Sequence, residues 1–306
     1  MDEDDGKSKS REKRRKKKEK EQKEQELREK EEALLDPEKV PETAEEFERM
    51  VLSSPSSSYV WIKYMAFFLE MTEIDKAREI ADRALKTISF REEQEKFNVW
   101  VARLNLENLY GTRESLMSVF EQACKLNDSK KMHMQLLGIF ERGGDAQVTE
   151  QFFKTLTRKF RKSCKVWLRY CTFKLRGAHP EAAGRMLERA LEAIPKRKHV
   201  KLIHKFATME YKLGSAERGR TLMEGVVVSS PKRIDLWSVF VDLELKSGHV
   251  EAARQLLERA ITLKLKGRQA KFLFKKMLEL EKTHGDAERV AEVKRKAREW
   301  VESNAE

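Results

Sequence analysis

The sequence predicts an all-α fold, an α-α superhelix or solenoid of about seven helix–turn–helix repeats. Three observations predict it. Tryptophans and other large apolar residues recur about every 35 residues in a similar phrase. A glycine usually follows each phrase after about ten residues. Only 6 Pro and 13 Gly occur in 306 residues, so long helices can form without interruption.

The first phrase of each repeat is clearest in Trp237-Ser-Val-Phe240-Val-Asp-Leu243-Glu244, where an aromatic anchor is followed by apolar residues three and six positions later. Residues at this spacing share one face of a helix, so the phrase predicts an amphipathic helix. The aligned anchors are Trp61, Trp100, Met134, Trp167, Ile203, Trp237 and Phe274. We interpret these anchors as core residues that hold the repeats together.

A turn and a second helix are expected after each first helix. The glycines at these turns are Gly111, Gly144, Gly177, Gly214, Gly248 and Gly285, and Thr72 stands at the first turn. A glycine just past a helix supplies the left-handed conformation that ends it. The second phrase is clearest in Ala253-Arg254-Gln-Leu-Leu-Glu258-Arg259-Ala260, where a small alanine lets two helices approach closely. Helix pairs of this kind must stack to bury their apolar faces.

A change of composition near residue 40 predicts two domains. Residues 1–40 are basic and of low complexity, so we expect them to be largely disordered or a single solvated helix. Residues 41–306 are expected to form the solenoid, with units that start near residues 58, 97, 131, 164, 200, 234 and 271. The leader holds a candidate nuclear localisation signal or nucleic-acid contact, with a solubilising linker as the alternative. Its residues are Arg11, Lys13, Arg14, Arg15, Lys16, Lys17 and Lys18.

Composition and motifs exclude several classes of protein. The net charge of +12 favours acidic partners, of which nucleic acid is the commonest. Cys124, Cys164 and Cys171 form no paired framework, which is typical of a reducing compartment. No apolar run approaches the ~18 residues of a membrane span. The chain has no phosphate-binding glycine loop and no zinc-ligand spacing. We therefore expect no catalytic site, metal site, cofactor or small-molecule substrate.

A glutamate ends most of the first phrases, at Glu107, Glu141, Glu210, Glu244 and Glu281. A catalytic site needs one constellation of residues, whereas these carboxylates recur once per repeat. We therefore expect them to be structural. The hypothesis is that they pair with arginines of the second helices, such as Arg220 or Arg254, or with backbone donors.

The loops that lead from one repeat to the next are basic in four successive places. The candidate contacts there are Lys162, Lys165, Lys196, Arg197, Lys198, Lys232, Arg233, Lys264, Lys266 and Arg268, and Lys159, Arg161, Lys201 and Lys271 lie beside them. Equivalent loops of a solenoid lie along one edge, so these residues could follow an RNA backbone or an acidic protein tail. A merely solvated edge is the alternative. Few aromatic residues lie among these charges, so base stacking is not expected. A groove for protein partners is expected on the surface lined by the second helices.

The two phrases resemble the half-a-tetratricopeptide (HAT) repeat, a TPR-like family with W-x-x-Y/F-x-x-L/F-E in its first helix and A-R-x-x-x-E-R-A-L in its second. The resemblance covers roughly residues 43–300 and implies a protein-binding scaffold of RNA processing. The run from Ser53 to Leu85 and the basic leader are also similar to the C-terminal module of large nucleolar proteins that carry many S1 RNA-binding domains before a HAT array. Because no S1-like barrel is present, we expect the chain to be the C-terminal part only or a short form.

That closer resemblance implies a non-catalytic role in ribosome biogenesis, in which pre-rRNA is processed towards 18S rRNA and the small subunit is assembled. It implies a nuclear and nucleolar location. The implied partners are pre-ribosomal assembly proteins, with pre-rRNA or a small nucleolar ribonucleoprotein as further candidates, and no membrane. Two alternatives stay open. One is a HAT scaffold of pre-mRNA splicing or polyadenylation, and the other is a direct, sequence-nonspecific RNA binder.

Overall fold

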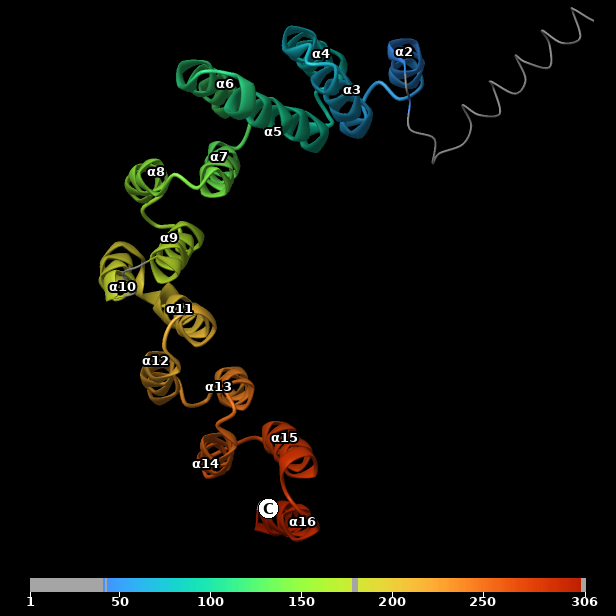
Figure 1. Ribbon diagram of the computed structural model, residues 1–306. Helices are drawn as coiled ribbons and strands as arrows, with labels where there is room; N and C mark the ends of the chain where they lie inside the picture. The colour runs from blue at the N-terminus through green and yellow to red at the C-terminus, as the bar shows by residue number, and fades with distance from the viewer. Residues whose placement is uncertain (1–40, 42, 178–180, 304–306) are drawn as a thin grey trace, which may run out of the picture. The chain divides into compact units, whose positions relative to one another are not determined.

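The computed structural model describes residues 41, 43–177 and 181–303, which consist of helices and short connections. No strand occurs in this described part of the chain, so the all-α prediction is confirmed. The leader and its candidate localisation residues lie outside the described residues. Figure 1 shows the helices in chain order.

The described residues form one single helix, α2 (Ala44–Ser53), followed by seven helix pairs. The first helices of the pairs are α3 (Ser58–Glu70), α5 (Glu93–Tyr110), α7 (Ser129–Gly143), α9 (Cys164–Arg176), α11 (His199–Leu213), α13 (Ile234–Lys246) and α15 (Gly267–His284). The second helices are α4 (Ile74–Thr87), α6 (Arg113–Leu126), α8 (Ala146–Lys159), α10 (Glu181–Ala193), α12 (Ala216–Ser229), α14 (Val250–Ile261) and α16 (Ala287–Ser303). A short 3-10 turn, η1 (Lys196–Lys198), precedes α11.

The chain divides into two compact bodies, one that ends at Gln135 and one that begins at Leu136. In the N-terminal body, α2 packs against α3, and the ring of Phe47 stacks on the ring of Tyr64 with centroids 5.0 Å apart. The same pairing recurs in the C-terminal body, where Phe153 of α8 stacks on Tyr170 of α9 at 4.7 Å. The helix α2 therefore covers α3 in the way that a second helix covers the first helix after it.

Two layers of helices make up the C-terminal body. In Figure 1, the second helices α8, α10, α12 and α14 follow one another on one side, and the first helices α9, α11, α13 and α15 follow on the other. Helix α9 contacts its partner α10 and the next first helix α11, and α11 in turn contacts α12 and α13. Apolar side chains of neighbouring pairs therefore share one core.

Small residues allow the two layers to pack closely. Ala84, Ala123, Ala190 and Ala260 occupy equivalent places in four second helices and have no exposed surface. Local signals set where several helices begin. The Asp145 side chain accepts hydrogen bonds from two backbone N–H groups at the start of α8, and the Thr112 side chain accepts one from the Ser115 N–H at the start of α6. Asp145 and Thr112 are residue types that commonly cap helices, so these helix starts can be recognised in the sequence.

The turns that reverse the chain differ from the expectation. Gly144 and Gly248 adopt positive φ values of 75° and 82°, as predicted for a helix-ending glycine. Thr72, at the turn that lacks a glycine, adopts a φ of 62°. The other four turn glycines have negative φ values, so the left-handed conformation is not the reason for glycine at those turns.

Candidate interaction surfaces

The seven anchor residues predicted from the repeat all lie in first helices. Six of them are buried, with exposed fractions from 1% at Trp61 to 8% at Met134. Ile203 is the exception, because it is only partly buried against the core while its neighbour Leu202 has no exposed surface. The anchors therefore lie in or against the core and leave the outer surface to other residues.

Three of the tryptophan anchors also hold the loop that precedes them. Each indole N–H donates a hydrogen bond to a backbone carbonyl six residues earlier: Trp61 to Pro55 at 2.9 Å, Trp167 to Arg161 at 2.7 Å, and Trp237 to Pro231 at 3.0 Å. This role of the tryptophans was not predicted from the sequence. A signal that could have revealed it is the proline that stands six positions before Trp61 and before Trp237. Because the ring nitrogen is fixed in the core, the loop carbonyl is fixed as well.

Two of the basic loops contain the same turn. A backbone hydrogen bond closes the turn 160–163 at 2.9 Å and the turn 230–233 at 3.1 Å. Lys162 and Lys232 therefore occupy the same position in a tryptophan-held turn. The equivalent turn in the N-terminal body, 54–57, carries serine at that position. The turn therefore recurs between repeats, whereas the lysine in it is present in only some of the loops.

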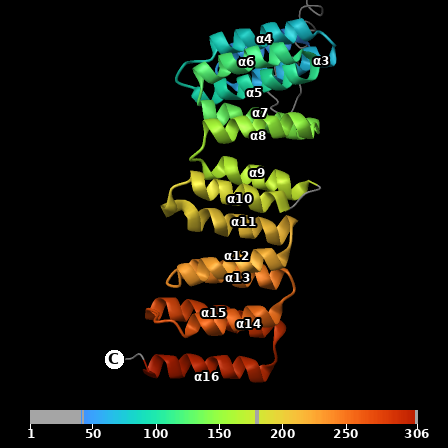
Figure 2. The ribbon, with the colours of Figure 1, turned by 90° about the vertical axis from the view of Figure 1, so that its left-hand side faces the viewer.

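The basic loops of the C-terminal body lie along one edge. Figure 2 shows the connections α8–α9, α10–α11, α12–α13 and α14–α15 one below another on the left-hand side, while the turns α11–α12, α13–α14 and α15–α16 lie on the right. We call this side the basic edge and define it by Lys162, Lys165, Lys196, Arg197, Lys198, Lys232, Arg233, Lys264, Lys266 and Arg268. All of them are exposed except Lys198, which is half-buried.

Most cations of the basic edge form no ion pair within the described residues. Arg233 is the exception, because its guanidinium donates to both carboxylate oxygens of Asp235, at 3.2 and 2.5 Å. The hydrogen bond from Arg233 lowers the pKa of Asp235 below its ordinary value. For the other nine residues no ion pair occurs within the described part of the chain. The basic edge therefore has uncompensated positive charge available for an anionic partner.

The recurring glutamates join one helix pair to the next. Arg78 donates to Glu107 at 2.9 and 3.1 Å, Arg220 to Glu244 at 2.8 and 2.7 Å, and Arg254 to Glu281 at 2.8 and 3.1 Å. In each case the arginine belongs to a second helix and the glutamate to the following first helix. The three carboxylates are at most 3% exposed. The hypothesis of a structural pairing is confirmed for Arg220 and Arg254.

The two remaining glutamates use other donors because the arginine is missing. Gly184 stands where α14 has Arg254, and Glu210 instead accepts from the Ser215 backbone N–H at 3.2 Å and from Arg218 at 3.4 Å. Met117 stands at the same place in α6. Glu141 accepts from Arg169 of α9, at distances of 2.6 to 3.3 Å.

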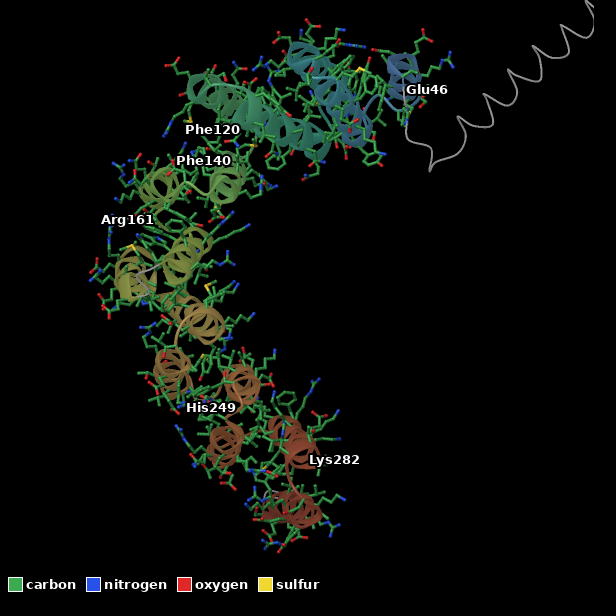
Figure 3. The ribbon with its side chains drawn as sticks, in the orientation of Figure 1. Glu46, Phe120, Phe140, Arg161, His249 and Lys282 are labelled. Carbon is green, nitrogen blue, oxygen red and sulfur yellow. The ribbon has the colours of Figure 1, made fainter. Side chains whose placement is uncertain are left out.

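Glu244 has the most complete set of partners. It is fully buried and also accepts a hydrogen bond of 2.5 Å from Tyr211, and His249 Nδ1 lies 3.1 Å from its carboxylate. His249 lies at the turn between α13 and α14 (Figure 3). Burial by itself would raise the pKa of Glu244, but the hydrogen bonds from Arg220 and Tyr211 outweigh it and lower the pKa. The carboxylate is therefore held ionised as a brace.

The same carboxylates explain three of the turn glycines. A Cβ atom added at Gly111, Gly214 or Gly285 would lie 2.2, 2.1 or 2.2 Å from the nearest carboxylate oxygen of Glu107, Glu210 or Glu281. Such a contact is far shorter than atoms tolerate. Glycine is required at these turns because the buried carboxylate packs against the backbone.

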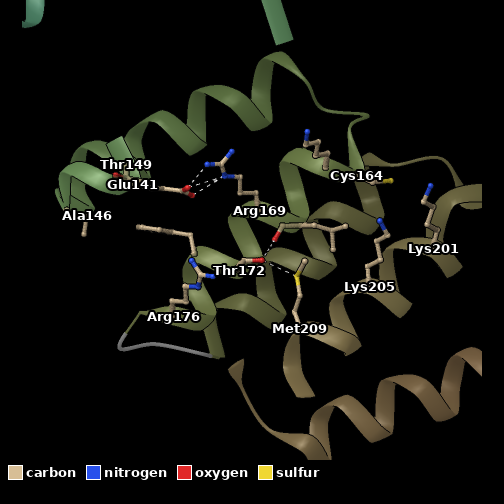
Figure 4. Close-up of a pocket in the computed structure, with 14 residues that line it drawn as sticks. Glu141, Ala146, Thr149, Cys164, Arg169, Thr172, Arg176, Lys201, Lys205 and Met209 are labelled. Carbon is tan, nitrogen blue, oxygen red and sulfur yellow. Dashed lines mark hydrogen bonds and ion pairs between the residues drawn. The ribbon is translucent and has the colours of Figure 1, made fainter. Parts of the chain in front are cut away.

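A pocket of about 820 Å³ opens on the first helices of the C-terminal body. It is lined by Glu141, Gly144, Ala146, Thr149, Cys164, Lys165, Leu168, Arg169, Thr172, Phe173, Arg176, Lys201, Lys205 and Met209. Figure 4 shows Lys201 and Lys205 on one side and the Glu141–Arg169 pair on the other. This pocket does not test the groove expected on the second helices, which stays a prediction. Its walls come mainly from α9 and α11, and Glu141 of α7 and Ala146 and Thr149 of α8 complete them.

The described residues contain neither a metal-ligand cluster nor a helix that could cross a membrane. No group of three or more His, Cys, Asp and Glu side chains there could hold a metal ion. No helix in that part of the chain combines the length and apolar character that crossing a bilayer requires. Cys171 is buried, and desolvation raises the pKa of its thiol to about 12, so it is protonated at neutral pH.

Stacked helix pairs, inter-repeat braces and broad charged surfaces define a class: this is a helical-repeat protein of the TPR-like kind. No family model matches the chain. Comparison with individual proteins is more specific. The chain is 46% identical over 275 residues to the protein RRP5 homolog of Mus musculus. The aligned residues cover 90% of this chain and 15% of that protein. It is 48% identical over 265 residues to the rRNA biogenesis protein RRP5 of Arabidopsis thaliana, covering 86% of this chain and 14% of that protein.

These identities confirm the resemblance to a module of ribosomal RNA-processing protein 5, also called programmed cell death protein 11. The chain spans about one seventh of the length of these relatives. A weaker match is the pre-mRNA-splicing factor SYF1 of Mycosarcoma maydis, 24% identical over 208 residues, which cover 63% of this chain and 18% of that protein.

Proposed function

We propose that this chain is a non-catalytic scaffold in ribosome biogenesis. It supports pre-rRNA processing towards 18S rRNA and small-subunit assembly by holding other macromolecules on its helix pairs. The observation that carries the proposal is the 44–48% identity, over about nine tenths of the chain, to proteins named for rRNA biogenesis. The braces support it, because they give the recurring glutamates a structural role.

The partners in this proposal are pre-ribosomal assembly proteins, and the location is the nucleolus. The test is sedimentation of the tagged chain through a gradient of nuclear extract, with the RNA of each fraction measured. We expect the chain to co-sediment with precursors of 18S rRNA. Co-sedimentation with spliceosomal RNA instead would favour the splicing alternative, for which the SYF1 match is the supporting observation.

A second proposed activity is direct contact with the RNA backbone along the basic edge. It is supported by the tryptophan-held turns and by the exposed cations that lack acidic partners. Because phosphate contacts release counterions, the affinity of such a contact falls steeply with salt.

The test compares the full chain with the variant Lys162→Glu/Lys232→Glu/Lys264→Glu in titrations of structured RNA at two salt concentrations. If the edge binds RNA, the variant should bind more weakly and its salt dependence should drop by about three released ions. An unchanged salt dependence would remove the basic edge from the RNA-binding surface.

A further inference from the structure

The pocket on α7, α9 and α11 combines an apolar floor with a cationic rim. Leu168, Phe173 and Met209 contribute apolar surface. The Thr172 hydroxyl in the floor is already satisfied, because it hydrogen-bonds the Leu168 carbonyl at 2.9 Å and Met209 Sδ at 3.0 Å. The floor therefore offers contact area to apolar groups of a partner with little need for new hydrogen bonds.

Positive charge dominates the rim. Lys165, Arg176, Lys201 and Lys205 are exposed, and none of them forms an ion pair in the described part of the chain. The single carboxylate of the pocket, Glu141, is already occupied by Arg169. A partner that enters the pocket therefore meets four free cations and no free anion, which favours an acidic ligand.

The floor favours a protein over a nucleic acid. Single-stranded nucleic acids gain most of their affinity in such grooves from bases stacked on aromatic rings. The pocket has one aromatic ring, Phe173, which packs in a tilted arrangement on Phe153 with centroids 5.2 Å apart. Leucine and methionine side chains supply the rest, and these suit apolar side chains of a peptide.

We propose that the pocket between α7, α9 and α11 binds an acidic segment of a protein partner that carries apolar side chains. The carboxylates of the segment contact Lys165, Lys201, Lys205 and Arg176 at the rim, and its apolar side chains cover Leu168 and Met209. This inference rests on the proposed scaffold function and assigns that function a specific surface and a ligand chemistry.

The test is a fluorescence anisotropy titration of the full chain with a labelled peptide in which Asp and Glu alternate with Leu and Phe. The pocket variant is Lys201→Glu/Lys205→Glu. The matched control is Lys232→Glu/Lys264→Glu, which makes the same charge change at exposed cations of the basic edge. We expect the pocket variant to bind about tenfold more weakly and the control less than about threefold more weakly, since only the former reverses contacting charges.

Two companion peptides separate the parts of the interaction. A peptide with Asn and Gln in place of the acids should lose binding, and so should one with Ser in place of Leu and Phe. Equal affinity of the pocket variant and the control for the acidic peptide would overturn the proposal. The proposal would also be overturned if single-stranded RNA bound the wild-type chain and the pocket variant lost affinity for this RNA while it kept the wild-type affinity for the peptide.

Cysteine reactivity locates the bound peptide. Cys164 lines the pocket, whereas Cys124 lies in the N-terminal body. Saturating peptide should slow modification of Cys164 by a thiol reagent and leave Cys124 unchanged, and unchanged reactivity of Cys164 would contradict the site. Gradient sedimentation of the same variants distinguishes failure of the pocket proposal from failure of the proposed scaffold function. A wild-type chain that co-sediments with 18S precursors but does not bind the peptide refutes only the pocket.

Discussion

Removing the carboxylate of Glu244 should destabilise the C-terminal body measurably. In Glu244→Ala, Arg220 loses two hydrogen bonds of 2.8 and 2.7 Å, and Tyr211 loses one of 2.5 Å. These contacts join α11 and α12 to α13. Stability in a repeat protein depends on the coupling between neighbouring repeats, so the substitution weakens one such interface.

The expected magnitude follows from burial. Removing one member of a buried ion pair costs about 3–5 kcal/mol when the other charge stays buried. Glu244 has no exposed surface, but the Arg220 side chain is 36% exposed and can regain water. We therefore expect a loss of about 2–3 kcal/mol, below the buried-pair range. For a body of this size that corresponds to a melting temperature lower by about 4–12 °C.

Differential scanning calorimetry of the full chain measures this loss. The matched control is Glu224→Ala, which removes an equivalent bidentate pair with Arg259 whose side chains are 36% and 50% exposed. An exposed pair contributes less than about 1 kcal/mol, so the control should melt close to the wild type. A Glu244→Ala variant that melts with the wild type, or no lower than the control, would refute the bracing role.

Three further predictions concern the same scaffold. Trp237→Ala should cost about 3–5 kcal/mol, because it removes a buried ring and the hydrogen bond that holds the loop, and calorimetry should show a lower or split transition. Gly285→Ala should cost about 1–3 kcal/mol in urea unfolding, because the new methyl group meets Glu281. Lowering the pH through about 4.5 should destabilise the chain, because the pKa values of Glu107 and Glu244 are lower in the folded state and their stabilisation is lost on protonation.

Two of these predictions have a control in the same chain. Gly225→Ala places its methyl group in open space on α12 and should be neutral or slightly stabilising. Glu244→Gln should show a shallower loss of stability in acid than the wild type, and equal slopes would contradict the role of this carboxylate. A Trp237→Ala variant with the wild-type melting profile would show that the repeat register is wrong.

The sequence was informative where its signals were local or repeated in register. Apolar residues at helical spacing predict the first helices, and the regular return of Trp and Ala predicts helix pairs. The Arg220–Glu244 pair could be predicted from the sequence because both residues recur at fixed positions of the repeat. A feature that is copied in several repeats can be recognised as structural before any contact is known.

Other features depend on contacts between segments and could not be predicted in this way. Ile203 fits the register of Trp237 but is only partly buried. Isoleucine has no ring N–H to reach the preceding loop, which is arranged around η1 instead. The glycines at 111, 214 and 285 were expected for their backbone conformation. They are needed because a carboxylate packs against them, which depends on the side chain of the preceding helix.

The sequence by itself determined that this protein is a stack of helix pairs with a strong positive charge, since periodicity and composition are properties of the chain. The tertiary structure decided which surfaces are left for partners. It placed the basic loops on one edge of the C-terminal body and gathered Lys165, Lys201 and Lys205 from two helices around one pocket. Those neighbours are about 36 to 40 residues apart in sequence, so only the stacking of the repeats brings them together.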